Sequence, residues 1–315
     1  MRTRRTFAIG TAASLALLLA GCGSDSSAES DNKITFSVWD TGLTGAVPKA
    51  LADDKALQDK YGIKVSAVST PNLPEVYSNV LSGKANANVG APETFASMAE
   101  KGAKVRVAGV VAPNTTVIVG RKGHFEPKDL KGKRLAAITS SGAWSVMEAR
   151  LKDKFGLTAG KDFEVVTVPN MLTGSAQVAA GTADYVMGWE PSVEQTLKKY
   201  PDMAVLLTSE ELGVDNSWQF VLGISDQVSD KSVEGLLKAL DATIDKLKSD
   251  PALADSYGAK QGYQDDTVSR VLKSGSLPMD AEPLNDAGRT SLMSDLKVIY
   301  KSGGLKKEPT TALLR

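Results

Sequence analysis

A strand, turn and helix in the middle of the chain constrain the fold more than any other stretch. Residues 135–138 are apolar and predict a short buried strand, and the hydroxyl side chains at 139–141 can cap a following helix. In that helix Trp144, Met147, Leu151 and Phe155 recur at spacings of three and four, the apolar stripe of an amphipathic helix. The free N–H groups at its start suit an anion or a polarised oxygen, although an ordinary capped helix explains the same pattern.

Strand and helix patterns alternate along most of the chain. The patterns predict strands at residues 34–39, 63–68, 86–90, 105–111, 117–119, 134–139, 163–168, 184–189, 205–207 and 218–224. They predict helices at 46–61, 75–81, 92–100, 144–155, 173–180, 190–199, 233–247, 251–257, 265–273 and 285–301. Alternation of this kind indicates parallel βαβ units, and hence an α/β fold.

The order of these elements predicts two α/β lobes. We expect residues 33–112 and 217–308 to form lobe 1, residues 113–216 to form lobe 2, and the chain to cross between them twice. Residues 309–315 are expected to be a loose C-terminal tail. Since α/β sheets bind ligands at the carboxyl ends of their strands, a cleft between the lobes is the expected site.

Composition excludes several kinds of function. His124 is the only histidine and lies in a polar turn, so a surface position is expected for it and a site with several histidines is impossible. Lys and Arg together number 37, as do Asp and Glu, and removal of residues 1–21 takes three arginines away and leaves a net charge of −3. Without a basic excess, nucleic acid is not an expected partner. No metal and no cofactor is expected.

The N-terminus has the pattern of an export signal. Arg2, Arg4 and Arg5 precede an apolar run over 7–19 that is too short to span a membrane. The run ends in LAGC at 19–22, which resembles the lipobox of bacterial lipoproteins, and Cys22 is the only cysteine. The residues around Arg4 and Arg5 also resemble a twin-arginine signal, and the export route stays open.

These observations predict a compartment. The lipobox resemblance implies that residues 1–21 are removed and that Cys22 carries a lipid. Residues 22–32 are small, polar and acidic, as in a flexible tether. The expected mature protein is a monomer anchored by lipid at the extracytoplasmic face of the cell membrane.

Three motifs in order resemble a family of binding proteins. They are LSGKANANVG at residues 81–90, DLKGKRLA at 129–136 and AAGTADYVMGWEP at 179–191. Together they resemble the substrate-binding components of ABC importers for taurine, alkanesulfonates, nitrate and thiamine pyrimidine precursors. The resemblance covers residues 34–207 and implies a type II periplasmic-binding-protein fold, closure of a hinge on the ligand, and an ABC permease with its ATPase as partners.

The resemblance and the strand ends indicate the same loops as candidate ligand contacts. The candidates are Trp39, Asp40, Thr41, Gly42, Leu43, Ala91, Pro92, Glu93, Thr94, Asn114, Ser140, Ser141, Gly142, Ala143, Trp144, Trp189, Glu190 and Trp218. All four tryptophans of the chain are among them, which predicts either an aromatic box or packing between the lobes. The set holds no Lys or Arg, and its acids Glu93 and Glu190 also suit helix starts.

The leading interpretation is a lipoprotein that captures a small organic solute, either taurine-like or sulfonate-like, or an aromatic or heterocyclic molecule. We expect the acceptor end of that solute at residues 140–142. Two alternatives come from other classes. One is an exported enzyme with Asp40 or Glu190 as general base, and the other is a surface interaction protein on the same fold.

Overall fold

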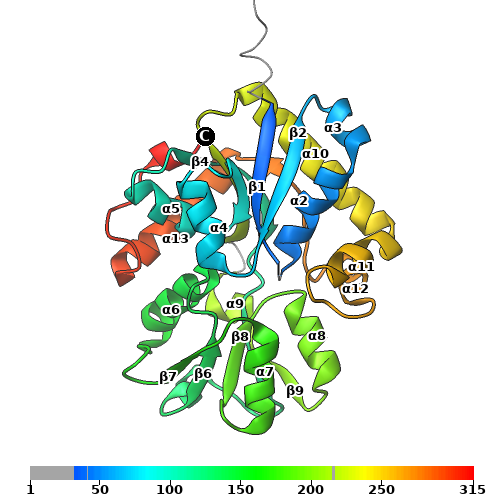
Figure 1. Cartoon of the computed structure of the whole chain (residues 1–315). Helices are drawn as coiled ribbons and strands as arrows, with labels where there is room; N and C mark the ends of the chain where they lie inside the picture. Colours follow the sequence, from blue (N-terminus) through cyan, green and yellow to red (C-terminus); the bar gives the residue numbers. More distant parts are fainter. Residues whose placement is uncertain (1–31, 41, 215–216) are drawn as a thin grey trace, which may run out of the picture.

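The computed structural model describes residues 32–40, 42–214 and 217–315. Its strands form two separate sheets, one above the other in Figure 1. The six strands of the first sheet, in the spatial order β11-β4-β10-β3-β1-β2, are β1 (Lys33–Trp39), β2 (Lys64–Thr70), β3 (Ala87–Gly90), β4 (Val105–Pro113), β10 (Trp218–Ser225) and β11 (Glu282–Pro283). The second sheet has the order β7-β6-β8-β5-β9, with β5 (Val117–Arg121), β6 (Arg134–Ala137), β7 (Glu164–Thr167), β8 (Tyr185–Gly188) and β9 (Met203–Leu207).

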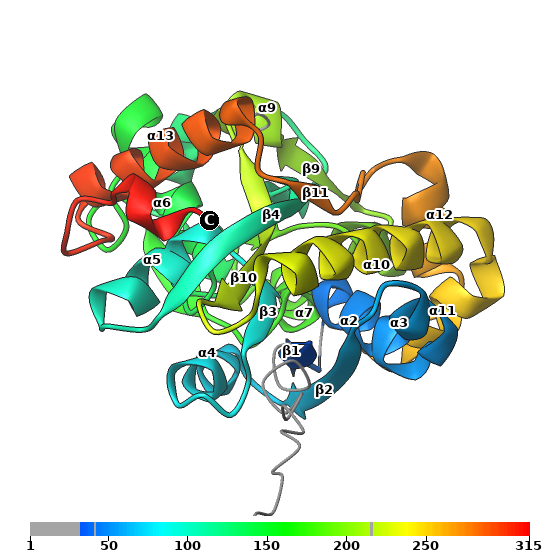
Figure 2. The same ribbon diagram turned by 90° about the horizontal axis from the view of Figure 1, so that it is seen from above.

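Helices cover both sheets (Figures 1 and 2). Those from the first half of the upper lobe are α2 (Leu43–Asp53), α3 (Lys55–Lys60), α4 (Leu73–Leu81) and α5 (Pro92–Glu100). The later segment of that lobe adds α10 (Asp230–Ser249), α11 (Pro251–Ala259), α12 (Thr267–Ser274), α13 (Asp286–Ser302) and the 3-10 turn η2 (Thr311–Leu313). The lower lobe holds η1 (Pro127–Leu130), α6 (Gly142–Phe155), α7 (Met171–Ala180), α8 (Ser192–Lys199) and α9 (Ser209–Leu212).

The two sheets are mixed, whereas the sequence pattern predicts parallel units. In the first sheet β1 pairs in parallel with β2 and β3, but β10 runs antiparallel to both β3 and β4. In the second, β6 pairs in parallel with β7 and β8, but β5 runs antiparallel to β8 and β9. The short β11 also runs antiparallel to β4. Two of the reversed strands, β5 and β10, are the first strands after each passage between sheets. A chain that leaves one sheet at its cleft edge must enter the next sheet from the cleft, which reverses that strand.

The long helix α10 shows how the apolar pattern sets the core. Its predicted stripe is buried along its whole length, with no side chain of the stripe more than 6% exposed. The stripe consists of Val233, Leu236, Leu237, Leu240, Ile244 and Leu247. Ser229 accepts a hydrogen bond from the Ser232 N–H and caps the helix start. In Figure 2 this helix lies beside α2, while α4 and α5 lie on the other face of the sheet.

Several predicted helices, such as those at 75–81 and 173–180, begin two residues later than the observed ones, and two more are wrong in other respects. The helix expected over 46–61 is two helices, because the Asp54 side chain accepts from the Leu57 N–H and begins α3. The helix expected from Glu190 begins at Ser192, and the Glu190–Pro191 peptide bond is cis.

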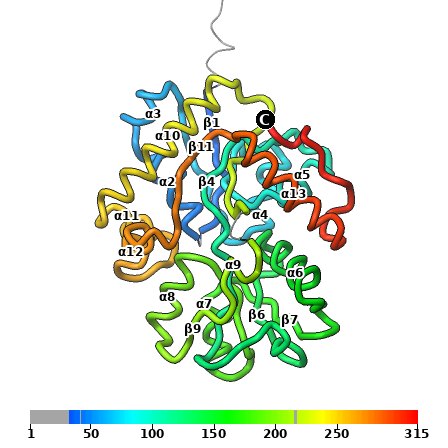
Figure 3. Tube along the Cα trace, turned by 180° about the vertical axis from the view of Figure 1, so that it is seen from behind, coloured from blue at the N-terminus to red at the C-terminus, as the bar shows by residue number. Residues whose placement is uncertain are grey.

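The prediction of a loose C-terminal tail is also wrong. Leu313 and Leu314 are each only 6% exposed, and Leu314 forms a bridge with Val107 of β4. The Arg315 guanidinium pairs with Asp230 at 2.8 Å. These contacts attach the last residues to the first sheet, close to the start of α10, as Figure 3 shows from behind.

The structure supports the predicted order of elements without testing the exact lobe limits. The limits at 112/113 and 216/217 therefore stay predictions. His124 is exposed as expected, with 83% of its side-chain surface accessible. Within the three described segments, no helix combines the length and the apolar character that a membrane span requires.

Candidate ligand-binding cleft

The cleft lies where strands of both sheets end. Trp39 ends β1, Ala91 follows β3, Ser141 comes after β6 and Trp189 follows β8. All four residues line one pocket. The carboxyl ends of parallel strands from two sheets thus form a single site, as α/β folds favour.

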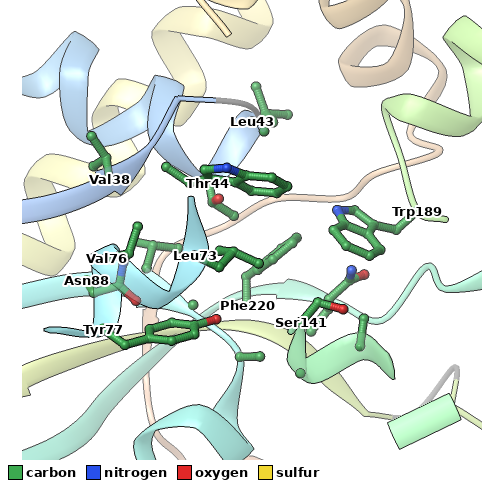
Figure 4. Close-up of a pocket in the computed structure, with 18 of the residues that line it drawn as sticks. Val38, Leu43, Thr44, Leu73, Val76, Tyr77, Asn88, Ser141, Trp189 and Phe220 are labelled. Atoms are coloured by element: carbon green, nitrogen blue, oxygen red, sulfur yellow. The ribbon is translucent and has the colours of Figure 1, made fainter. Parts of the chain in front are cut away.

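The inner part of this pocket is an apolar slot in the upper lobe. Figure 4 shows side chains of β1 and α4 on one side, Trp189 and Ser141 on the other, and Phe220 between them. The apolar lining residues are Val38, Leu43, Leu73, Val76, Val89 and Phe220. Such a surface favours a ligand with an apolar or aromatic body, because burying that body removes apolar area from water.

Two buried amides line the slot with one unpaired atom each. The Asn88 side chain donates to the Ser37 carbonyl at 2.8 Å, and its Oδ1 has no partner among the described residues. The Gln219 Oε1 accepts from the Thr115 N–H at 3.0 Å, and its Nε2 is likewise unpaired there. Because buried polar atoms are nearly always hydrogen-bonded, these two atoms favour a ligand with both a donor and an acceptor.

Glu190 is the only Asp, Glu, Lys or Arg among the described residues of this lining. Its Oε2 accepts from the Glu194 N–H at 3.1 Å, so it caps α8, and its own N–H donates to the Thr115 hydroxyl at 3.3 Å. Burial raises the pKa of Glu190, partly offset by the hydrogen bond from Glu194. Burial also raises the pKa of the nearby Tyr77 to about 12, so this phenol stays protonated. The lining therefore offers no positive charge to an anion.

The turn at residues 139–144 does not present its serine hydroxyls to the cleft in the way that the sequence predicts. The Ser141 hydroxyl donates to the Ile138 carbonyl at 2.7 Å and accepts from the Trp144 N–H at 3.2 Å, so the cap uses it. Ser140 is exposed and lines a neighbouring polar pocket instead. The capped helix is confirmed, and the structure does not bring the Ser140 and Ser141 hydroxyls together at the main pocket.

Only two tryptophans line the pocket. Trp39 and Trp189 line it. Trp144 is 6% exposed and belongs to the apolar core, and Trp218 packs against that core. Trp218 lies near Gly288 at the start of α13. A box of four tryptophans is therefore wrong, because the first turn of α6 directs Trp144 into the core.

Glu93 contacts the other lobe and does not line the main pocket. It is 5% exposed, and its Oε1 has no hydrogen-bond partner among the described residues. A Cβ placed on Gly142 would lie only 1.6 Å from this oxygen, so the bare glycine permits the contact between α5 and α6. Burial raises the pKa of Glu93 to about 7.

The other predicted contacts fall into three groups. The first group lines the pocket and consists of Gly42, Leu43, Gly142 and Ala143. The second group lies outside the main lining, and in it Asp40 pairs with Lys49 at 3.1 Å. Outside the main lining lie Pro92 as the first residue of α5, Thr94 in the polar pocket beside Glu93, and Asn114, whose Oδ1 accepts from the Thr116 N–H. Thr41 and Cys22 lie outside the described residues.

Tyr77, Asn88 and Gln219 are polar lining residues that were not predicted from the sequence. Asn88 is the one that carried a signal, since an amide in an otherwise apolar strand is unusual. Gln219 and Thr115 are 104 positions apart, and only the fold brings them together.

Comparisons with known proteins agree with this geometry. The alkanesulfonate-binding protein SsuA from Xanthomonas axonopodis pv. citri, bound to MOPS, matches with a TM-score of 0.71 and 19% identity over 88% of this chain and 95% of that one. The periplasmic aliphatic sulphonate-binding protein SsuA from Escherichia coli matches with a TM-score of 0.72 and 16% identity, over 88% and 89%. The periplasmic nitrate-binding protein NrtA from Synechocystis PCC 6803 gives 0.66 and 15%, over 89% and 84%. A comparison with curated protein sequences finds no match.

The fold is thus the two-lobe fold of the periplasmic binding proteins, as predicted. The family model described as NMT1/THI5 like matches residues 46–254, more than half of the chain. The protein belongs to this NMT1/THI5-like family.

Proposed function

We propose that the protein is the extracytoplasmic solute-binding component of an ABC importer, which binds a small organic solute and delivers it to a permease and its ATPase. The family membership and the two-lobe fold support this role. The observation that carries it is the pocket lined by both lobes at the strand ends. Closure of two lobes on a solute explains why the lining comes from segments so far apart.

The ligand proposed here is a neutral or cationic molecule with a flat ring. Trp39 and Trp189 supply aromatic surface, and the lining contains the acidic Glu190 but no Lys or Arg. A sulfonate or nitrate would find no opposite charge among these residues. An aromatic ring would gain from packing against the indoles, and a cationic ring would gain about 0.5–2 kcal/mol from cation–π attraction.

Thermal unfolding with two sets of probes tests the ligand class. One set is taurine, methanesulfonate and nitrate, and the other is 4-aminopyrimidine, benzamidine and related amino-substituted rings. A ligand at 100 times its Kd should stabilise the protein by about 2.7 kcal/mol. Stabilisation by the anions with none by the rings would overturn the assignment.

Variants of the two indoles test the site itself. Trp39→Ala and Trp189→Ala should each weaken ring binding at least tenfold in calorimetric titration. Trp218→Phe is the matched control, because Trp218 is outside the pocket lining. Equal losses in all three variants would place the ligand elsewhere. Native mass spectrometry of protein purified with its own solute would identify that solute.

The lipid anchor is a separate part of the proposal and rests on the lipobox-like LAGC at 19–22. Expression with labelled palmitate should label the wild-type protein in the membrane fraction. The Cys22→Ser variant should lose the label and the membrane association. Label retained in that variant would refute lipidation at Cys22.

The enzyme alternative finds little support in the site. Asp40 is paired with Lys49, and Glu190 caps α8 through the Glu194 N–H. Asp40 does not line the main pocket, and no other Asp, Glu, Lys, Arg or His of the described lining stands beside Glu190 to share acid–base chemistry with it. A binding protein releases its ligand unchanged, so incubation followed by mass spectrometry of the ligand separates the two functions.

A further inference from the structure

A second compartment adjoins the main pocket on the far side of the two indoles. Trp39, Gly42 and Trp189 line both spaces, so the compartments share a wall. Both lobes contribute to the second compartment, with Ser192 and Gln195 from α8 and Tyr263 from the α11–α12 loop.

The wall of this compartment carries an unpaired acceptor. Gln195 is 5% exposed, and its Oε1 has no hydrogen-bond partner among the described residues. A buried carbonyl oxygen without a donor is costly and uncommon in a folded protein. In the main pocket Asn88 Oδ1 and the donor Gln219 Nε2 also lack partners among the described residues, so unpaired amide atoms occur on both sides of the indoles.

The surroundings of Gln195 select the kind of donor. None of the described lining residues is an Asp, Glu, Lys or Arg, so the compartment offers no counterion to a charged group. The nearby Tyr263 hydroxyl lies 3.5 Å from the Ser192 hydroxyl, and burial raises the pKa of Tyr263 to about 12, which keeps this phenol neutral. An amide N–H or a hydroxyl fits such a neutral polar wall, whereas an ammonium would lose its hydration without a partner.

Another part of the wall, formed by Gln261, has its polar atoms fully hydrogen-bonded within the protein. Gln261 is 2% exposed, and in the amide orientation that satisfies both its ends, its nitrogen donates to the Trp39 carbonyl at 2.9 Å. Its oxygen then accepts from Lys49 Nζ at 2.8 Å. Gln261 therefore fixes the backbone of the Trp39 loop and leaves Gln195 as the unsatisfied amide.

We propose that this compartment is a second subsite of the cleft, which takes an uncharged donor-bearing substituent of the solute and pairs it with Gln195 Oε1. The inference rests on the proposed function, with the ring of the solute at Trp39 and Trp189. The solute then has two parts, a flat ring in the main pocket and a hydroxyl or amide group that extends past the indoles.

Three small probes in solution test the subsite without knowledge of the solute. Acetamide is a neutral donor, acetate is its anionic counterpart without a donor, and methylammonium is a cationic donor. Each is titrated into ¹⁵N-labelled protein, and the Gln195 side-chain amide signals are assigned by their absence in Gln195→Met. Acetamide should shift these signals in a saturable way, and acetate and methylammonium should shift them at least tenfold more weakly.

Two variants make the result decisive. Gln195→Met keeps the size of the side chain and removes the acceptor, so acetamide should no longer shift the Tyr263 and Gly262 signals. Gln195→Glu keeps an acceptor and adds a charge, so methylammonium should now bind more tightly than acetamide. The exposed Gln227→Met variant is the control for folding and should behave as wild type.

The outcomes that overturn the subsite are equally defined. They are no saturable shift by acetamide in the wild type, an unchanged shift in Gln195→Met, or equal binding of acetate. A different result would contradict the proposed function, namely unchanged ring binding in Trp39→Ala and Trp189→Ala. The two failures can therefore be told apart. A ring that binds while acetamide does not would refute the subsite alone.

Discussion

At the scale of single residues, the contact of Gly142 with Glu93 sets how closely the two lobes can approach. A Cβ at position 142 would lie 1.6 Å from Glu93 Oε1 and 2.5 Å from the Ala91 Cβ. The carboxylate could swing away, but the Ala91 Cβ is fixed to the backbone. The absence of a side chain at Gly142 is therefore a condition for this arrangement of α5 and α6.

Gly142→Ala should hold the lobes apart. We expect a larger radius of gyration in small-angle X-ray scattering and at least a tenfold loss of ring affinity, which corresponds to about 1.4 kcal/mol. Gly123→Ala is the control, since a Cβ there meets nothing within 4 Å. An unchanged radius and affinity in Gly142→Ala would show that the lobes do not need this contact.

Glu93 makes stability depend on pH. Its pKa is raised from the usual 4.5 to about 7 because the carboxyl is buried. The folded protein thus holds this proton more tightly than the unfolded chain, so raising the pH from about 4.5 to 7 lowers the free energy of unfolding, by about 3 kcal/mol at most. Glu93→Gln stays neutral and should lose this part of the pH dependence in urea unfolding at pH 5 and pH 8. The same pH dependence in both proteins would rule out Glu93 as its source.

Single residues also show what a sequence can reveal. The cap at Ser141 and its helix were predictable, because capping uses atoms only three positions apart. The place of Ser140 outside the main pocket and the burial of Trp144 were not predictable. Both depend on where α6 lies against the rest of the molecule.

At the scale of elements, α6 and α13 are joined by a partly buried ion pair. Arg150 lies 2.9 Å from Asp295, and their side chains are 20% and 15% exposed. Burial raises the pKa of Asp295 to about 6, and Arg150 partly offsets this rise. The pair therefore links a helix of the lower lobe to one of the upper lobe, as Figure 3 shows for the two helices.

Removal of Arg150 should destabilise the protein more at high pH than at low pH. In Arg150→Met the pKa of Asp295 rises further, so its carboxyl is neutral at pH 5 and unpaired but charged at pH 8. We expect a loss of about 2 kcal/mol at pH 8 and a smaller loss at pH 5, measured by urea unfolding. Addition of Asp295→Asn should recover most of the loss at pH 8. Equal losses at both pH values would show that packing, not charge, is what Arg150 contributes.

The C-terminal turn η2 is an element that the sequence pattern did not predict. Three residues are too few for an apolar stripe, so Leu313 and Leu314 gave no periodic signal. Leu314→Ala should lower the free energy of unfolding by about 2–3 kcal/mol, because the Leu314 side chain is buried. The exposed Thr311→Ala in the same turn should change it by less than about 0.5 kcal/mol. Equal stability of the two variants would mean that the terminus is attached only loosely.

At the scale of the whole molecule, local patterns predicted the order of strands and helices and the two passages of the chain. They did not predict the pairs that join distant segments. Arg150 and Asp295 are 145 positions apart, and Thr115 and Gln219 are 104 apart. Such pairs are formed by the topology of the fold, so the spacing of residues along the chain does not predict them. The polar atoms of the cleft were missed for the same reason.

A charged network spans the two lobes on the side opposite to Arg150. Lys198 on α8 lies 2.9 Å from Asp265 and 3.3 Å from Asp266, and Arg270 on α12 lies 3.2 Å from Glu194. These side chains are 31–68% exposed, so each pair contributes only about 0–1 kcal/mol to folding. The open and closed arrangements of the lobes differ by only a few kcal/mol, so energies of this size can shift the balance between them. They are too small to unfold the protein.

Reversal of the charge at Lys198 should therefore open the lobes without unfolding them. In Lys198→Glu a carboxylate faces Asp265 and Asp266, and we expect a larger radius of gyration at low salt that returns towards the wild-type value in about 0.5 M NaCl, where charges are screened. Lys199→Glu makes the same charge change one position further along α8, where the ammonium lies over the Tyr200 ring, and should leave the radius unchanged. The free energy of unfolding should change by less than about 1 kcal/mol in both variants. An equal increase of the radius of gyration in both variants would mean that net charge, and not this network, sets the separation of the lobes.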